Sequence, residues 1–208
     1  PCVLLQMTLV AFSDIIQIAR EWNSDGLLKS FVLSNIHGLS PNFINGVKTV
    51  DYEETKQLYL HILDAYEKHQ DWVVLKIFLD ECLAYWKDRP IIDAGQSVPM
   101  ATCMPINSKI YIDSQMQIGI CEKVADKYRI GNVKNGIDWK RANEIVEEYY
   151  HKRVERCKYC PAIRMCDMCL TAVEYSDEQW DILCHNERVY AQIFMFLYCE
   201  MAERGLIK

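Results

Sequence analysis

Four cysteines lie within thirteen residues of this chain, in the segment CKYCPAIRMCDMC at residues 157–169. The whole chain has ten cysteines in 208 residues, and eight of them fall between Cys103 and Cys199. Thiolates are ligands of zinc and of iron–sulfur clusters. Because nothing else in the sequence suggests secretion, so many cysteines indicate metal binding in the second half of the chain.

Three kinds of site compete for these sulfurs. Disulfides are disfavoured, because four cysteines this close together could hardly all pair locally. The C-x2-C pairs resemble zinc ligands, but zinc ribbons separate their pairs by about 15–20 residues, far more than the short spacer here. An iron–sulfur cluster is wider than one ion and takes thiolates from a short loop plus a distant position. The cysteine spacing therefore favours iron–sulfur clusters, with zinc as the alternative.

Basic side chains surround the first cysteine pair. A [4Fe–4S] centre held by four thiolates is anionic, and cations nearby stabilise its reduced form and tune its potential. The alternative is a solvated helix end, where cations are favoured by the helix dipole. The basic residues are Lys152, Arg153, Arg156, Lys158 and, inside the loop, Arg164.

The first ninety residues alternate between apolar runs and amphipathic helices. This alternation is typical of βαβ units with a parallel sheet, in which ligands bind at the carboxyl ends of the strands. In order, we expect a strand over 3–10, a helix capped by Ser13, a strand over 30–36, a helix from Asp51 and Glu54 to about His69, and a third apolar run, over 72–79, as the next strand. The residues at strand ends are then Ser34, Asn35, His37, Asp80 and Glu81, unless they are loop residues without a special role.

The second half predicts a hairpin and two helices. Strands over 108–113 and 117–121 would form the hairpin and bring Cys103 and Cys121 near each other. A helix is expected from Asp138 to about residue 152. A long final helix would begin at Ser176 with Gln179, carry Cys184 and end at Gly205.

The order of these cysteines resembles that of radical S-adenosylmethionine (radical SAM) enzymes with a SPASM domain. That family's signature is a Cys, a Gly five positions before a second Cys, a C-x2-C-x5-C-x3-C segment and a last Cys. The resemblance covers residues 100–185. The matching residues are Cys103, Cys121, Cys157, Cys160, Cys166, Cys169 and Cys184.

The resemblance implies two auxiliary [4Fe–4S] clusters. One would be held by Cys157, Cys160, Cys166 and Cys184, and the other by Cys103, Cys121 and Cys169. Some members add a fourth cysteine to the second cluster at the position of Lys109 here, so that cluster would keep an open iron site, or take Cys82 or a substrate group.

This chain departs from the family pattern at two places. Met116 stands where the family has Gly, so we expect other residues to make the hairpin turn. Only Asp167 and Met168 separate Cys166 from Cys169, where three residues are usual, which affects how Cys169 reaches its cluster.

The resemblance also implies an α/β fold. Residues 1–90 would be the C-terminal βα units of a partial (β/α)6 barrel with a bridge, and residues 91–208 the SPASM domain with its hairpin and helices. The chain begins PCVLLQMTLV, without Met, and lacks the C-x3-C-x2-C loop that binds the SAM cluster. We therefore expect a C-terminal fragment, inactive alone and of uncertain status as an enzyme.

In the intact enzyme, the resemblance implies that a third [4Fe–4S] cluster reduces S-adenosylmethionine to a radical that abstracts hydrogen from a peptide or protein. Maturation of a ribosomal peptide by a thioether or carbon–carbon crosslink is the first expectation. Formylglycine formation, as in anaerobic sulfatase maturases, is the second. A non-catalytic zinc-binding or electron-transfer module is the rival from another class. The expected reductant is a flavodoxin or ferredoxin.

Charge and hydropathy limit the other partners. A net charge of −6, from 29 acidic and 23 basic residues, argues against nucleic acid. No apolar run approaches the ~20 residues of a membrane span, and we expect a cytoplasmic protein. Cys2 and Cys199 lie in apolar runs and are expected to be buried. His61 and His69 are expected at the surface, while His151 and His185 are weaker candidates for hydrogen bonds to cluster sulfur. The sequence leaves the substrate, the bond formed and the oligomeric state open.

Overall fold

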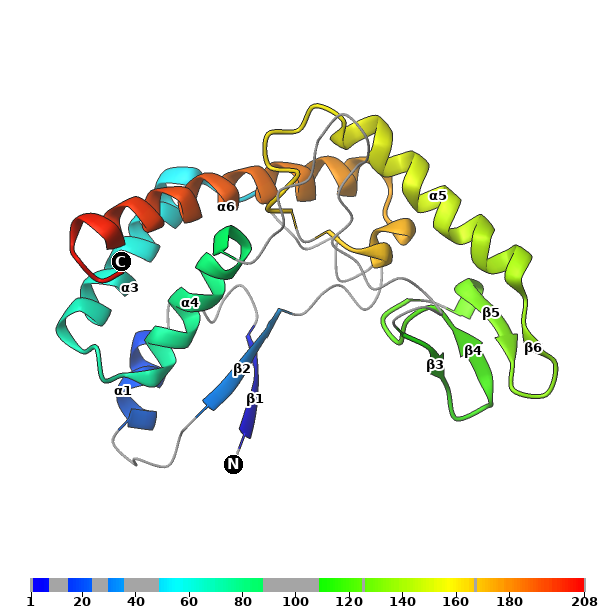
Figure 1. Cartoon of the computed structure of the whole chain (residues 1–208), viewed down its shortest axis with the longest axis horizontal. Coiled ribbons are helices and arrows are strands. Elements are labelled where there is room, and N and C mark those ends of the chain that lie inside the picture. Colours follow the sequence, from blue (N-terminus) through cyan, green and yellow to red (C-terminus); the bar gives the residue numbers. More distant parts are fainter. Residues whose placement is uncertain are drawn as a thin grey trace. The chain divides into compact units, whose positions relative to one another are not determined.

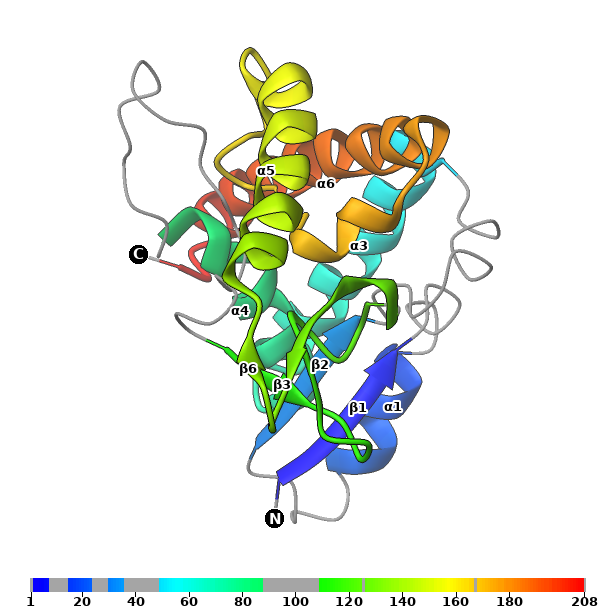
Figure 2. The same cartoon turned by 90° about the vertical axis from the view of Figure 1, so that its right-hand side faces the viewer.

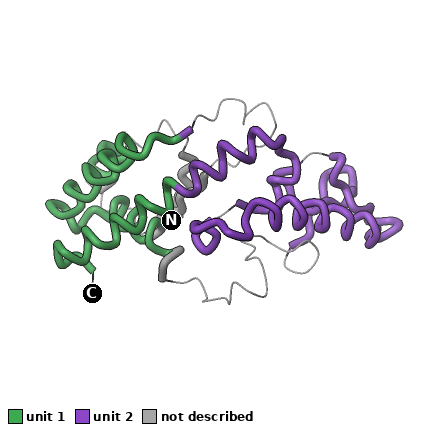
Figure 3. The backbone as a smooth tube through the Cα atoms, turned by 90° about the horizontal axis from the view of Figure 1, so that it is seen from above, with its two compact units in different colours: residues 1–36, 50–90, 189–208 green, residues 37–49, 91–188 purple. Residues whose placement is uncertain are grey.

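The structure, a computed structural model, describes residues 2–7, 15–23, 30–35, 49–87, 109–124, 126–166 and 168–207. These residues form a mixed α/β protein with five α-helices (Figure 1). The chain divides into two compact units: residues 1–36, 50–90 and 189–208 form unit 1, and residues 37–49 and 91–188 form unit 2 (Figure 3). The break at residue 90 lies where the sequence places a domain boundary, but residues 189–208 belong to unit 1.

Unit 1 contains one βαβ element. Strand β1 (Cys2–Met7) and strand β2 (Ser30–Asn35) pair in parallel, with helix α1 (Ile15–Asn23) between them in the chain (Figure 2). The register pairs Cys2 with Ser30 and Met7 with Asn35. The predicted parallel pairing is therefore confirmed, and Asn35 is the last residue of its strand. The strands within the described ranges form no barrel.

Helix α3 (Tyr52–Lys68) begins and ends where its sequence predicts. The carboxylate of Asp51 accepts a hydrogen bond of 2.8 Å from the backbone N–H of Glu54, which satisfies one of the free donors of the first turn. His69 is the C-cap. Tyr59, Ile62 and Leu63 are the buried residues of this helix.

The apolar run over 72–79 is not a strand, which corrects the prediction. It belongs to helix α4 (Val73–Lys87), so Asp80 lies in the middle of a helix, exposed, and not at a strand end. The helix forms because the apolar pattern continues beyond residue 79 at spacings of three and four, which line one face of a helix. The buried residues of that face are Val74, Leu75, Phe78, Leu79, Cys82 and Leu83.

Unit 2 has a four-stranded antiparallel sheet of order β3-β4-β5-β6. Strands β3 (Tyr111–Ile112) and β4 (Gln117–Gly119) confirm the predicted hairpin, although both are shorter than expected. Strand β5 (Arg129–Asn132), preceded by the 3-10 helix η2 (Asp126–Tyr128), and strand β6 (Gly136–Ile137) complete the sheet.

The hairpin turn corrects a second prediction. Met116 itself adopts a left-handed conformation, with a φ of 60°, at the position where the related family has Gly. Its backbone N–H donates to the carbonyl of Asp113 at 3.0 Å, and the carboxylate of Asp113 accepts from the N–H groups of Gln115 and Gln117. The Asp113 side chain thus holds the turn in a shape that a Met tolerates at a cost.

Two long helices complete unit 2, and the second of them continues into unit 1. Helix α5 (Trp139–Cys157) begins at the predicted cap Asp138, whose carboxylate accepts from the N–H of Arg141, and runs five residues further than predicted. After the 3-10 helix η3 (Leu170–Glu174) comes helix α6 (Asp177–Glu203). Ser176 and Gln179 form the predicted reciprocal capping box.

Each unit has its own hydrophobic core. In unit 2, Trp180, Tyr149 and Ile145 are fully buried and pack with residues of the sheet and of η3. In unit 1, Ile193 and Leu197 of α6 pack with the buried faces of α1, α3 and α4. Helix α6 ends as predicted at Gly205, which has a φ of 66°, and the N–H of Leu206 donates to the carbonyl of Met201. Within the described ranges, every helix is too short or too polar to span a bilayer.

Candidate iron–sulfur cluster site

Cys157 is the last residue of α5, and a chain of tight turns leads from it to Cys166. The N–H of Cys160 donates to the carbonyl of Cys157 at 3.0 Å, and the N–H of Ile163 donates to that of Cys160 at 3.2 Å. The N–H of Cys166 then donates to the carbonyl of Ala162 at 2.9 Å. These bonds compact the segment, so that three cysteines of the predicted four-thiol set share one short stretch of backbone.

Arg156 ties the end of α5 to the beginning of α6, where the fourth cysteine lies. Its Nη2 lies 2.9 Å from Asp177 Oδ1 and 3.9 Å from Asp181 Oδ1. Its guanidinium carbon also lies 5.8 Å from the centre of the Trp180 ring. These contacts of Arg156 hold the first two turns of α6 against α5, and Cys184 is in the next turn.

The thiols of Cys157, Cys160 and Cys184 lie near enough to influence one another electrostatically. Burial, followed by the charges of Cys157 and Cys160, raises the pKa of Cys184 to about 11, while Arg188 and Arg156 oppose the shift. Burial also raises the pKa of Cys157, against the opposing charge of Arg153. With these raised pKa values Cys157 and Cys184 are protonated at neutral pH when no metal is bound, so metal binding must release their protons.

Arg153 lies beside the Cys157 and Cys166 thiols and is completely buried, with 0% of its surface exposed. Its Nη1 donates to the carbonyl of Met168 at 2.9 Å and to the hydroxyl of Tyr149 at 3.2 Å, and it lies 4.0 Å from Cys166 Sγ. Burial acts to lower the pKa of Arg153, but the charges of Tyr149, Cys166 and Cys157 outweigh it and the pKa is raised. Arg153 is therefore a permanent positive charge beside two of the four thiols.

The chemistry of this donor set fits a [4Fe–4S] cluster. Cys157, Cys160, Cys166 and Cys184 supply four free thiols, and a buried guanidinium balances negative charge beside them. The Nε of Arg156 is also buried and has no hydrogen-bond partner among the described residues. In those same residues, no group of three or more Cys, His, Asp or Glu side chains is close enough together to hold a single metal ion.

Cys169 begins the 3-10 helix that follows the cysteine loop. It caps η3, and its Sγ lies 3.0 Å from Thr171 Oγ1. The carbonyls of η3 are held by the Trp180 indole, by Tyr128 and by Lys152. The short segment between Cys166 and Cys169 is held at the Met168 carbonyl, which accepts from both Tyr149 and Arg153.

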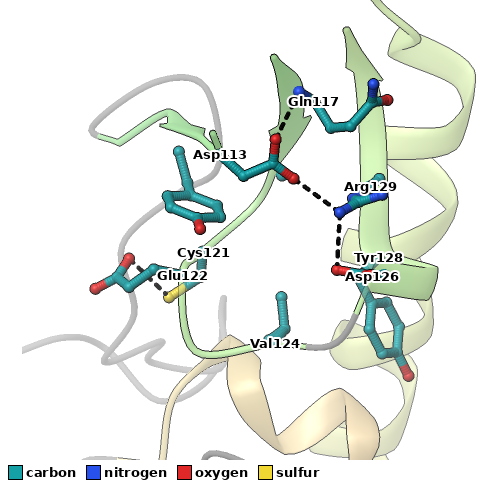
Figure 4. Close-up of a pocket in the computed structure, with 10 residues that line it drawn as sticks. Asp113, Gln117, Cys121, Glu122, Val124, Asp126, Tyr128 and Arg129 are labelled. Carbon is teal, nitrogen blue, oxygen red and sulfur yellow. Dashed lines mark hydrogen bonds and ion pairs between the residues drawn. The ribbon is translucent and has the colours of Figure 1, made fainter. Parts of the chain in front are cut away.

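Cys121 follows strand β4 at the mouth of a small open pocket. Its Sγ lies 3.5 Å from Glu122 Oε2 and 4.0 Å from Lys109 Nζ, and Lys109 makes an ion pair of 2.6 Å with Glu122. Figure 4 shows Cys121 and Glu122 at one end of the pocket and the Arg129 ion pairs with Asp113 and Asp126 at the other. Burial raises the pKa of the half-buried Cys121 thiol.

The other predicted candidates have mixed outcomes. Cys103 and His37 lie outside the described residues. Cys82 is buried in the core of unit 1, where its side chain shares a hydrogen bond with Tyr59.

One expected burial is wrong. Cys199 is exposed, because the buried face of α6 runs through Ile193, Leu197 and Met201 and a residue two positions from Leu197 points to the other side. His61 and His69 are exposed, as predicted, and His151 and His185 are exposed as well.

Sequence reasoning missed the special position of Arg153. It grouped this residue with four other cations, whereas the structure buries Arg153 alone among them completely. A helical-face argument contained the signal, since Ile145, Tyr149, Arg153 and Cys157 recur every four residues on the buried side of α5.

No protein-family model, no curated protein and no solved structure matches this chain.

Proposed function

We propose that this chain is the C-terminal portion of a radical SAM enzyme that modifies a peptide or protein, and that it binds two auxiliary [4Fe–4S] clusters. The observation that carries the proposal is the buried charge of Arg153 beside Cys157 and Cys166, together with the electrostatic coupling of Cys184 to Cys157 and Cys160. A buried cation among thiols is costly unless negative charge accompanies it, and a thiolate-held cluster supplies that charge.

The four thiols would hold one cluster, with Arg156 fixing the helix that carries Cys184. Cys121 and Cys169, together with Cys103, would hold the second, beside the pocket of Figure 4. When bound, such clusters accept an electron or bind a substrate group. Two thiols of the first site, Cys157 and Cys166, are buried, which suits an electron acceptor, and the half-buried Cys121 of the second site suits a centre that faces a substrate.

Unit 1 is consistent with the end of a partial (β/α)6 barrel. It supplies one parallel βαβ element, which is the repeating unit of such a barrel. The proposed substrate is a ribosomal peptide that receives a thioether or carbon–carbon crosslink, with formylglycine formation as the alternative. The proposed reductant is a flavodoxin or ferredoxin, and the proposed location is the cytoplasm.

Anaerobic reconstitution of the chain with iron and sulfide tests the proposal. We expect a brown protein with about eight iron atoms per chain, and an electron paramagnetic resonance signal after reduction. Cys184→Ser should halve the iron content. Cys199→Ser is the matched control, because Cys199 is on the same helix and exposed, and it should leave the iron content unchanged.

A colourless protein that takes up zinc and no iron would contradict the proposal and favour the zinc-stabilised module. Equal iron loss from Cys184→Ser and Cys199→Ser would also contradict it, since binding would then not depend on the four-thiol set.

A further inference from the structure

Of the five cations around the first cysteine pair, only Arg153 is removed from solvent. Lys158 and Arg164 are exposed, and Lys152 and Arg156 are partly buried, whereas Arg153 has 0% of its surface exposed. Solvent and salt screen exposed charges strongly and buried charges weakly. Arg153 is therefore the one cation of this group whose charge acts at nearly full strength on its surroundings.

The neighbours of Arg153 hold its guanidinium in one place. Tyr149, one turn earlier on α5, is fully buried, and its hydroxyl donates to the Met168 carbonyl at 2.8 Å. Arg153 Nη1 donates to that same carbonyl at 2.9 Å and to the Tyr149 oxygen at 3.2 Å. The three groups form a closed hydrogen-bonded triangle, so the charge cannot swing away when the charge on the thiols changes.

The triangle lies directly against the proposed ligands. Nη1 of Arg153 is 4.0 Å from Cys166 Sγ, and the charge of Cys157 also acts on the guanidinium. Cys157 is one helical turn beyond Arg153 on the same face of α5. The electrostatic interaction between Arg153 and a charge on either sulfur is therefore screened by protein and not by water.

We infer that Arg153 is a positioning residue that raises the reduction potential of the cluster held by Cys157, Cys160, Cys166 and Cys184. The inference rests on the proposed function. An added electron makes that cluster more negative, and a fixed buried cation stabilises the reduced form more than the oxidised form. The effect makes this cluster the better electron acceptor of the two, since the cation beside Cys121 in the described part of the chain, Lys109, is partly exposed and paired with Glu122.

The experiment compares neutral and charged residues at position 153 and at a matched surface position. Arg153→Gln removes the charge and keeps a donor for the Met168 carbonyl, Arg153→Lys keeps the charge, and Lys158→Gln removes an exposed charge five residues away. All are made in a Cys121→Ala background, so that one cluster remains, and are reconstituted anaerobically. The readouts are iron per chain, far-ultraviolet circular dichroism and a redox titration followed by electron paramagnetic resonance.

We expect Arg153→Gln to bind iron and to shift the reduction equilibrium at least tenfold toward the oxidised form, which is 59 mV for one electron. Arg153→Lys should recover most of that shift, and Lys158→Gln should change the equilibrium less than twofold.

Equal potentials for Arg153→Gln and Arg153→Lys at equal iron content would overturn the inference. So would loss of iron from both variants with iron retained in Lys158→Gln, because Arg153 would then serve folding alone. Absence of iron from the unaltered chain would contradict the proposed function itself, which distinguishes the two failures.

Discussion

The two sets of thiols in unit 2 are supported in different ways. Cys157, Cys160, Cys166 and Cys184 come from the end of α5, a turn-rich loop and the third turn of α6. The buried guanidinium of Arg153 lies beside Cys157 and Cys166. Cys121 comes from a small sheet with short strands, and its neighbouring cation, Lys109, keeps 35% of its side chain exposed.

This difference in support is also a difference in electrostatics. Two unit charges 4 Å apart interact by roughly 4 kcal/mol near a protein surface and by roughly 1 kcal/mol in bulk water. Arg153 and Lys109 each have a nitrogen 4.0 Å from a cysteine sulfur, but solvent screens the charge of the partly exposed Lys109 more than that of the buried Arg153. Cys121, beside the sheet, is half-buried and lines the open pocket of Figure 4.

The largest expected effect comes from removing one thiol from each set, which tests whether the two sets bind iron independently. We expect Cys157→Ala and Cys121→Ala each to lower the iron content from about eight to about four atoms per chain, and the double variant to bind almost none. Iron analysis after anaerobic reconstitution measures this. If either single variant lost all of its iron, the two sets would be one site and the comparison would fail.

The stability of α5 and α6 in unit 2 should depend on Trp180. This side chain is fully buried, donates to the Ala172 carbonyl at 3.0 Å and faces Arg156. Trp180→Ala should lower the free energy of unfolding by about 3–5 kcal/mol, because it leaves a large cavity. Denaturant titration measures the loss. Trp139→Ala is the control, because 65% of Trp139 is exposed, and an equal effect there would rule out the packing argument.

The stability of the sheet should depend on Gly131. Its φ of 145° disfavours any side chain, and a Cβ at this position would overlap the backbone carbonyl of Gly136 on β6. Gly131→Ala should cost about 1–3 kcal/mol and should disturb binding at Cys121 more than at Cys157. Gly136→Ala has open space around its Cβ, so it tests the backbone conformation alone and should cost less.

Asp138 connects the sheet to the helices of unit 2, because it follows β6 and caps α5. Asp138→Ala should cost about 1 kcal/mol, since it leaves the N–H of Arg141 without its cap. Asp51→Ala makes the same change on α3 in unit 1 and should cost a similar amount without affecting iron. Iron loss from both variants alike would mean that the caps act through global stability only.

The smallest expected effect is a gain at the hairpin turn. Met116→Gly removes the strain of a left-handed Met, of about 1–2 kcal/mol. Part of that gain is offset by the greater freedom of Gly in the unfolded chain. We expect a net stabilisation of about 0.5 kcal/mol. Met116→Ala keeps the strain and should bring no gain, so equal stability of the two variants would show that the turn is not strained.

Features that depend on a few neighbouring residues were predictable from the sequence. Asp51 with Glu54, Asp138, and Ser176 with Gln179 cap helices through bonds to residues three positions away, so the local sequence suffices. The parallel pairing of β1 and β2 also followed from the alternation of strand and helix patterns. The four-thiol set came from the order of the cysteines and its resemblance to a known family, and it stays a prediction.

Features that depend on tertiary packing were not predictable in this way. The run over 72–79 is apolar throughout, so only its continuation to Lys87 distinguishes helix from strand. The burial of Arg153 depends on Tyr149 and Met168, which meet only after α5 and the loop fold together. The φ of Met116 follows from the bonds that Asp113 makes across the turn.

Helix α6 belongs to both hydrophobic cores. Trp180, near its beginning, packs in the core of unit 2, and Ile193, Leu197 and Met201 pack in the core of unit 1. Melting either core removes part of the surface on which one end of this helix is stabilised. A calorimetric scan of the chain should therefore show one cooperative transition, because unfolding of either core lowers the stability of the other.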